Sequence, residues 1–301
     1  FSVIFIYTIF YLIRSAPAIP SFGLMKKLLS YGLPIIPLIL LMPFLTVSDR
    51  YFLNVFSSVE DIGRYGIAYK FGMLINMLLV IPVQRSWGPQ MFQVGNLIEE
   101  NKRIHRDITF YYSYIGLFII LGLYLFAETI LLIFANEDYL SVSWVIPWIS
   151  LAYFIGGFKI FLQASASIAD RTDLFIKTGI YTIISNLLLN YILIKNFSIQ
   201  GAVASTILSY LILVILLFFS SKRVSKIKWP IKRIIHGASI AFFLIITFYI
   251  LKKNDLDYEI IIKVFLLTLF PIISLLTNLI GNKELKGLRS LWNSFFKKVL
   301  A

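Results

Sequence analysis

The chain has no cysteine among its 301 residues, only two histidines and few charged side chains. Without cysteine it forms no disulfide and no thiolate-ligated metal site. His105 and His236 each lie in a basic segment without further ligand residues, so we expect no metal site. The sequence also lacks a glycine-rich phosphate loop, an HExxH pair and a nucleophile elbow. We therefore expect no cofactor and no catalytic residue, and predict that the chain is not an enzyme.

Charged residues make up 14% of the chain, hydrophobic residues make up 59%, and the mean hydropathy is +0.84. Soluble domains carry about 25% charged residues, so this composition excludes an ordinary soluble protein. The apolar residues fall in blocks close to the ~20 residues that a helix needs to cross a bilayer. The sequence thus predicts an all-α polytopic membrane protein.

We expect about nine spans, of which the first is partial. The chain opens with Phe1, and Phe1–Ile13 is apolar without the features of a signal peptide. This segment has the character of the tail of a helix, and we expect the sequence to be a C-terminal fragment. The full spans are predicted at Leu28–Phe56, Gly63–Val83, Ile108–Phe126, Ser143–Ala166, Leu174–Ile194, Gly201–Phe219, Gly237–Leu251 and Ile260–Ile280.

Lysine and arginine are divided unequally between alternate connections. Of the 28, 20 lie in one set of connections, five lie in the other set, and the rest lie inside spans. Because positive residues gather on the cytoplasmic side, this bias predicts a cytoplasmic C-terminus. The net charge of +13 then belongs to loops that face anionic lipid, so we expect membrane lipids as partners and no nucleic acid.

Ionised residues lie inside or at the rims of these spans. A cation deep in a bilayer is unfavourable by about 2.5–3.5 kcal/mol on insertion scales, so it usually faces a bundle interior or a watery cavity. Lys70 and Lys159 lie deepest and are predicted to face a lumen, with Arg50 as the third candidate. For Arg50 the alternative is a local ion pair with Asp49 at the outer interface. Arg64 is predicted to extend to the membrane surface.

Polar side chains also follow one face of two consecutive spans. Lys159 and Gln163 share a face of the first, and Asn186 and Asn190 share a face of the next. Such a stripe either joins helices through hydrogen bonds worth about 0.6–2 kcal/mol each or lines a cavity. We include Gln163, Asn186 and Asn190 among the lumen candidates. The secondary candidates are Asp49, Arg64 and Asn76.

The block from Tyr31 to Phe92 contains YGLPIIP, SDRYFLNVF and IGRYGIAYKFGMLIN, then Trp87-Gly88-Pro89 before QMF. These motifs resemble the bacterial polysaccharide flippases (Wzx-type) of the MATE-like multidrug/oligosaccharidyl-lipid/polysaccharide exporter superfamily, at the start of their second six-helix lobe. The resemblance implies a MATE-like second lobe at 28–221. Residues 1–27 would end a truncated helix and form a linker. Residues 222–301 would form a basic loop, two extra peripheral helices and a cytoplasmic amphipathic tail.

The function implied by this resemblance is flipping of undecaprenyl-pyrophosphate-linked oligosaccharides across the bacterial cytoplasmic membrane for O-antigen or capsule synthesis. A polysaccharide polymerase is a further expected partner. The cations Arg50, Lys70 and Lys159 would attract pyrophosphate, while the amides would bind sugar hydroxyls.

Three alternatives stay open at this point. The first is a multidrug or lipid-precursor exporter of the same superfamily. Export of an organic cation needs a buried acid, whereas Asp49 and Asp170 are interpreted as rim residues. A membrane-embedded polymerase or glycosyltransferase needs a large catalytic loop, which the sequence lacks. A non-transporting scaffold leaves the buried lysines unexplained.

Overall fold

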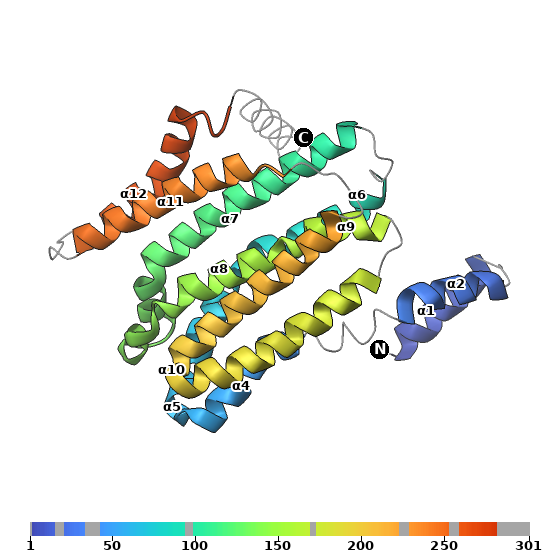
Figure 1. Ribbon diagram of the computed structural model, residues 1–301, viewed down its shortest axis with the longest axis horizontal. Helices are drawn as coiled ribbons and strands as arrows, with labels where there is room; N and C mark the ends of the chain where they lie inside the picture. The colour runs from blue at the N-terminus through green and yellow to red at the C-terminus, as the bar shows by residue number, and fades with distance from the viewer. Residues whose placement is uncertain are drawn as a thin grey trace.

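The computed structural model describes residues 2–15, 21–33, 43–93, 99–168, 173–222, 229–252 and 259–281. Within these ranges every regular element is a helix, and six helices are long and apolar enough to cross a membrane. Figure 1 shows a bundle of long helices, with α1 (Ser2–Ser15) and α2 (Phe22–Gly32) to one side of it. The chain is therefore an all-α, multi-pass membrane protein, which confirms the predicted fold class.

The remaining elements form the bundle, in which η2 is a π-helical turn and η3 a 3-10 helix. In chain order they are α4 (Phe44–Phe56), α5 (Val59–Gly72), η2 (Asn76–Val80), α6 (Ile81–Gln93), α7 (Glu99–Phe134), η3 (Glu137–Val142), α8 (Val145–Gly157), α9 (Lys159–Ile168), α10 (Asp173–Lys222), α11 (Ile231–Lys252) and α12 (Glu259–Leu276).

Most predicted spans coincide with a helix. The predicted span Leu28–Phe56 includes the end of α2 and all of α4, and 34–42 between them lies outside the described residues. The predicted span Ser143–Ala166 is broken at Phe158, which separates α8 from α9. After Glu128, α7 continues to Phe134, and η3 follows it. α10 contains two predicted spans, because it reverses at Ser198, where φ is 47° (Figure 1).

The connections that are poor in lysine and arginine meet at one end of the bundle. The hydroxyl of Ser198 lies 2.8 Å from that of Ser57 and donates to Asp61 Oδ2 at 3.3 Å, so the reversal of α10 contacts the α4–α5 hairpin. α5 also packs against η3. We call this the charge-poor end. That it faces the outside of the cell stays a prediction from the charge bias.

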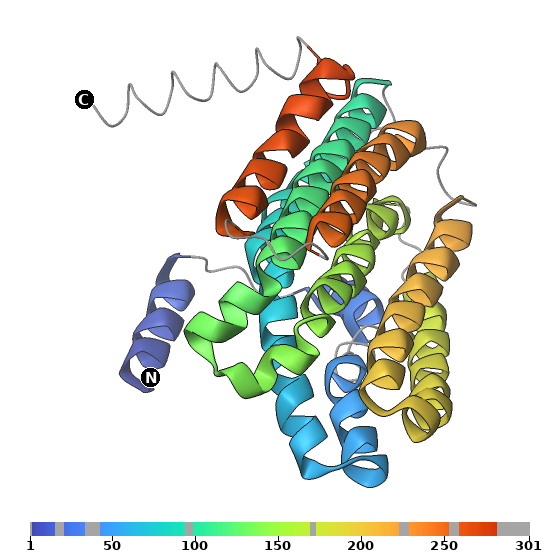
Figure 2. The same ribbon diagram turned by 90° about the vertical axis from the view of Figure 1, so that its left-hand side faces the viewer.

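The last two helices pack along α7, as Figure 2 shows. At the charge-poor end Lys252 of α11 pairs with Glu128 of α7. There Lys263 of α12, which is 3% exposed, donates to Thr129 Oγ1 of α7 at 3.1 Å. These contacts hold the pair α11–α12 against the bundle. Asp170, the basic segment 223–228 and the predicted amphipathic tail beyond Gly281 lie outside the described residues.

Candidate functional site

A partly open cavity of about 340 Å³ lies between α4, η2, α8, α9 and α10. Its polar lining consists of Thr46, Asn76, Tyr153, Lys159 and Tyr210, and no carboxylate is among the described residues that line it. Lys159, a main lumen candidate from the sequence, and Asn76, a secondary one, therefore line the same cavity.

Irregular helix geometry places these two side chains. Lys159 begins α9 directly after the break between α8 and α9, and Asn76 begins the π-helical turn η2. The break follows Gly156 and Gly157, where a Cβ would overlap the ring of Tyr210 and the hydroxyl of Tyr112, respectively. The two glycines thus allow both tyrosines to approach the end of α8.

Lys159 carries the only charge on the described lining of this cavity. It lies within the candidate membrane span Val145–Gln163. Among the described residues, its ammonium group has neither an ion-pair partner nor a hydrogen-bond acceptor. An unpaired cation within a membrane is unfavourable, so the cavity favours binding of an anion.

A chain of aromatic residues extends from the cavity wall to Arg50. The hydroxyl of Tyr153 lies 2.8 Å from the hydroxyl of Tyr69. The guanidinium of Arg50 lies 5.1 Å from the centre of the Tyr69 ring, in a cation–π contact. Its Nε is buried and has no hydrogen-bond partner in the described part of the chain. Arg50 therefore contacts the site through Tyr69 without lining the cavity itself.

Asp49, which the sequence suggested as a rim residue, is buried among the helices and only 1% exposed. Its carboxylate accepts hydrogen bonds from the hydroxyl of Tyr65 at 2.5 Å and from the main-chain N–H of Arg50 at 2.8 Å. The prediction considered only residues beside Asp49 in the sequence. Tyr65 lies on the neighbouring helix, and pairing between helices leaves no local sequence signal.

Asn186 and Asn190 lie in a buried network outside the cavity lining, at 2% and 0% exposure. Ser48 of α4 donates to Asn186 Oδ1 at 2.8 Å, and Asn190 donates to Ser48 Oγ at 2.9 Å. Asn186 also donates to Ser209, and Ser205 donates to Asn190. These bonds join α4 to both arms of α10. The structure thus favours the interhelical interpretation of this polar stripe over sugar binding.

The remaining predicted site residues lie elsewhere. Lys70 is exposed near the end of α5, and Gln163 is half-buried on α9. Arg64 forms an ion pair with Glu60 one turn earlier on α5, at 2.7 Å on the bundle surface. None of these side chains lines the cavity around Lys159. Within the described ranges, no group of three His, Asp or Glu residues is placed to hold a metal ion.

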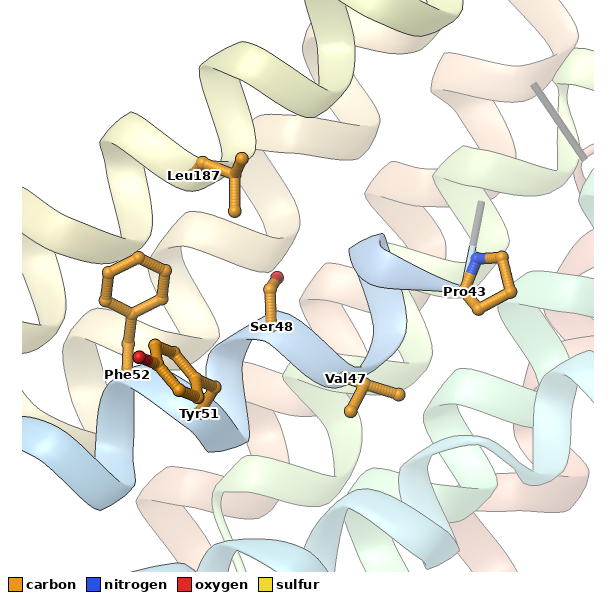
Figure 3. A pocket seen from close by; sticks show the side chains of 6 residues that line it. All are labelled: Pro43, Val47, Ser48, Tyr51, Phe52 and Leu187. Atoms are coloured by element: carbon orange, nitrogen blue, oxygen red, sulfur yellow. The ribbon is translucent and has the colours of Figure 1, made fainter. Parts of the chain in front are cut away.

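A larger groove of about 600 Å³ lies between α4 and the first arm of α10. Figure 3 shows Leu187 reaching from α10 toward α4 across this groove. The described residues that line it are Pro43, Val47, Ser48, Tyr51, Phe52 and Leu187. Because none of these side chains is charged, the groove offers no group that would hold an ionic ligand, and the smaller cavity is the candidate site.

Comparison with known proteins finds one family match and one similar fold. Residues 1–94 match a family described as polysaccharide biosynthesis protein. No curated protein gives a significant match. Among solved structures the chain is similar to lipid II flippase MurJ in an inward closed conformation, with a TM-score of 0.65 and 18% sequence identity. The likeness covers 88% of this chain and 58% of the MurJ chain, so the sequence spans less than two thirds of that flippase. The fold is therefore MurJ-like.

Proposed function

We propose that the chain forms part of a transporter that flips undecaprenyl-pyrophosphate-linked oligosaccharides across the bacterial cytoplasmic membrane for surface polysaccharide synthesis. The observation that carries this proposal is Lys159, which has no partner among the described residues and lines a cavity within a membrane span. The family match and the MurJ-like fold support the same class of function. A cytoplasmic C-terminus and a polysaccharide polymerase that uses the flipped product belong to this proposal.

The cavity lining fits the charged part of such a substrate. Lys159 would attract the pyrophosphate, and Asn76, Thr46, Tyr153 and Tyr210 offer N–H and O–H donors to its oxygens. A volume of 340 Å³ is near the lower end of small-molecule sites, about 300–1,000 Å³, so it would hold pyrophosphate and not a whole oligosaccharide. The isoprenoid tail would remain in lipid. Flipping breaks no bond, so it requires no catalytic group.

A multidrug exporter is the second candidate, because Asp49 is a buried acid of the kind that organic cations require. However, both oxygens of Asp49 already accept hydrogen bonds within the protein. Asp49 is also absent from the cavity lining, where Lys159 would repel a cation. These contacts favour the flippase over the multidrug exporter.

Binding to the purified product of the complete gene separates the two candidates. Geranylgeranyl pyrophosphate serves as the anionic lipid probe and tetraphenylphosphonium as the organic cation. We expect the pyrophosphate to bind and Lys159→Ala to weaken it about tenfold, the equivalent of about 1.4 kcal/mol. Binding of the cation alone, with loss in Asp49→Asn, would overturn the proposal in favour of multidrug export.

A further inference from the structure

A second cavity, of about 310 Å³, lies between α7, α8 and α11 at the charge-poor end. Its lining includes Tyr124, Glu128, Trp144, Tyr249 and Lys252. It shares no described lining residue with the cavity around Lys159. The function proposed above makes no use of it.

Two helix ends and a late turn of α7 meet at this second cavity. Lys252 is the last residue of α11, Trp144 directly precedes α8, and Glu128 lies near the end of α7, which continues to Phe134. Polar residues near the ends of apolar spans lie at the level of the lipid headgroups. Tryptophan and tyrosine are enriched at this level of membrane proteins, because their rings are apolar and their N–H and O–H groups are polar. The second cavity is therefore at headgroup depth.

The wall of this cavity carries one charge of each sign. Lys252 Nζ lies 2.5 Å from Glu128 Oε2, and the two side chains are 43% and 38% exposed. An exposed ion pair contributes little to stability, so a ligand that replaces its interactions can open it. A purely anionic ligand would meet Glu128, and a purely cationic one would meet Lys252. A ligand with both charges satisfies both residues.

We propose that this cavity binds the headgroup of a zwitterionic phospholipid that carries a primary ammonium group, as phosphatidylethanolamine does. Lys252 binds the phosphate, and Glu128 accepts N–H hydrogen bonds from the ammonium. A quaternary ammonium has no N–H to donate, so phosphatidylcholine binds less well. The apolar part of the lining, which includes Phe248 and Pro147, contacts the start of the acyl chains. The proposal depends on the membrane-spanning fold and not on the transported substrate.

Lipid retention tests this site. The product of the complete gene is placed in nanodiscs that contain equal parts of dioleoyl phosphatidylethanolamine, phosphatidylcholine and phosphatidylglycerol. The lipids that stay bound are then identified by native mass spectrometry. We expect the wild-type protein to retain phosphatidylethanolamine about fivefold over the other two, a preference of about 1 kcal/mol. Glu128→Gln should abolish the preference over phosphatidylcholine, and Lys252→Gln should weaken retention of all three.

Arg64→Gln is the matched control, because it removes a surface ion pair elsewhere on the bundle. It should retain lipids as the wild type does. The wild-type measurement is informative even if a variant fails to fold. Equal retention of the three lipids, or a preference for phosphatidylglycerol, would overturn the proposal. An unchanged preference in folded Glu128→Gln would also overturn it and leave the ion pair as a contact that only joins α7 to α11.

Discussion

Lys159 and Asn76 line one cavity, although they begin different helical elements far apart in the sequence. They meet because α6 packs against α9 while α8 packs against η2. A cation and an amide thus face the same space inside a membrane span. Neither side chain is needed for the helix of the other to form, so only the tertiary packing brings the two together. This juxtaposition identifies the candidate site for an anion.

The hydrogen bond between Asp49 and Tyr65 should stabilise the packing of α4 against α5. Hydrogen bonds to charged groups contribute about 1.5–3 kcal/mol, and in a double-mutant cycle Asp49→Asn and Tyr65→Phe should couple by that amount. The free energy of unfolding in detergent is the measurement. Tyr181→Phe, at an exposed position, should be additive with Asp49→Asn. If the effects of Asp49→Asn and Tyr65→Phe on the free energy of unfolding are also additive, the hydrogen bond contributes nothing to stability.

Asn190→Ala should destabilise the protein without blocking transport by the molecules that stay folded. It removes one hydrogen bond each from Ser48 and Ser205, at about 0.5–1.5 kcal/mol per bond, while their hydroxyls still donate to Asn186 and to the carbonyl of Ala202. Asn196→Ala removes an exposed amide that bonds within its own helix and should be nearly silent. Thermal unfolding midpoints and surface glycan per folded protein are measured together. Lost display at an unchanged midpoint would return Asn190 to the substrate-binding residues.

Single cysteines should report the orientation cleanly, since the chain has none of its own. Cysteine at Asp138 or Gln200, both at the charge-poor end, should react with an impermeant thiol reagent in intact spheroplasts. Cysteine at Ser225 or Asn282 should react only after permeabilisation, because these positions lie in lysine- and arginine-rich segments. The reverse labelling pattern would place the charge-poor end in the cytoplasm.

Composition and hydrophobic length were sufficient to predict the fold class and most spans. Hydrophobic length depends on residues close together in the sequence, which is also why Lys159 could be recognised as a cation inside a span. The reversal at Ser198 agrees with two separate predicted spans. The break at Phe158 was missed because α8 and α9 together have the length of one apolar span.

The details of the site depend on contacts between helices. Tyr69, Tyr153 and Tyr210 carried no sequence signal, since aromatic residues are common in membrane spans. These three tyrosines lie on different helices and contact one another only because α5, α8 and α10 pack together. Asn186 and Asn190 were recognised as a polar stripe, but the sequence alone could not distinguish a helix-joining stripe from a cavity wall.

Surface glycan display by Lys159→Ala, made in the complete gene and normalised to transporter abundance in the membrane, tests the central claim most directly. We predict a loss of about tenfold, most of it restored in Lys159→Arg, because the cavity needs a positive charge. Lys70→Ala should lose less, since Lys70 does not line the cavity, and exposed Lys195→Ala should be normal. Normal display by Lys159→Ala at normal abundance would contradict the proposed anion site.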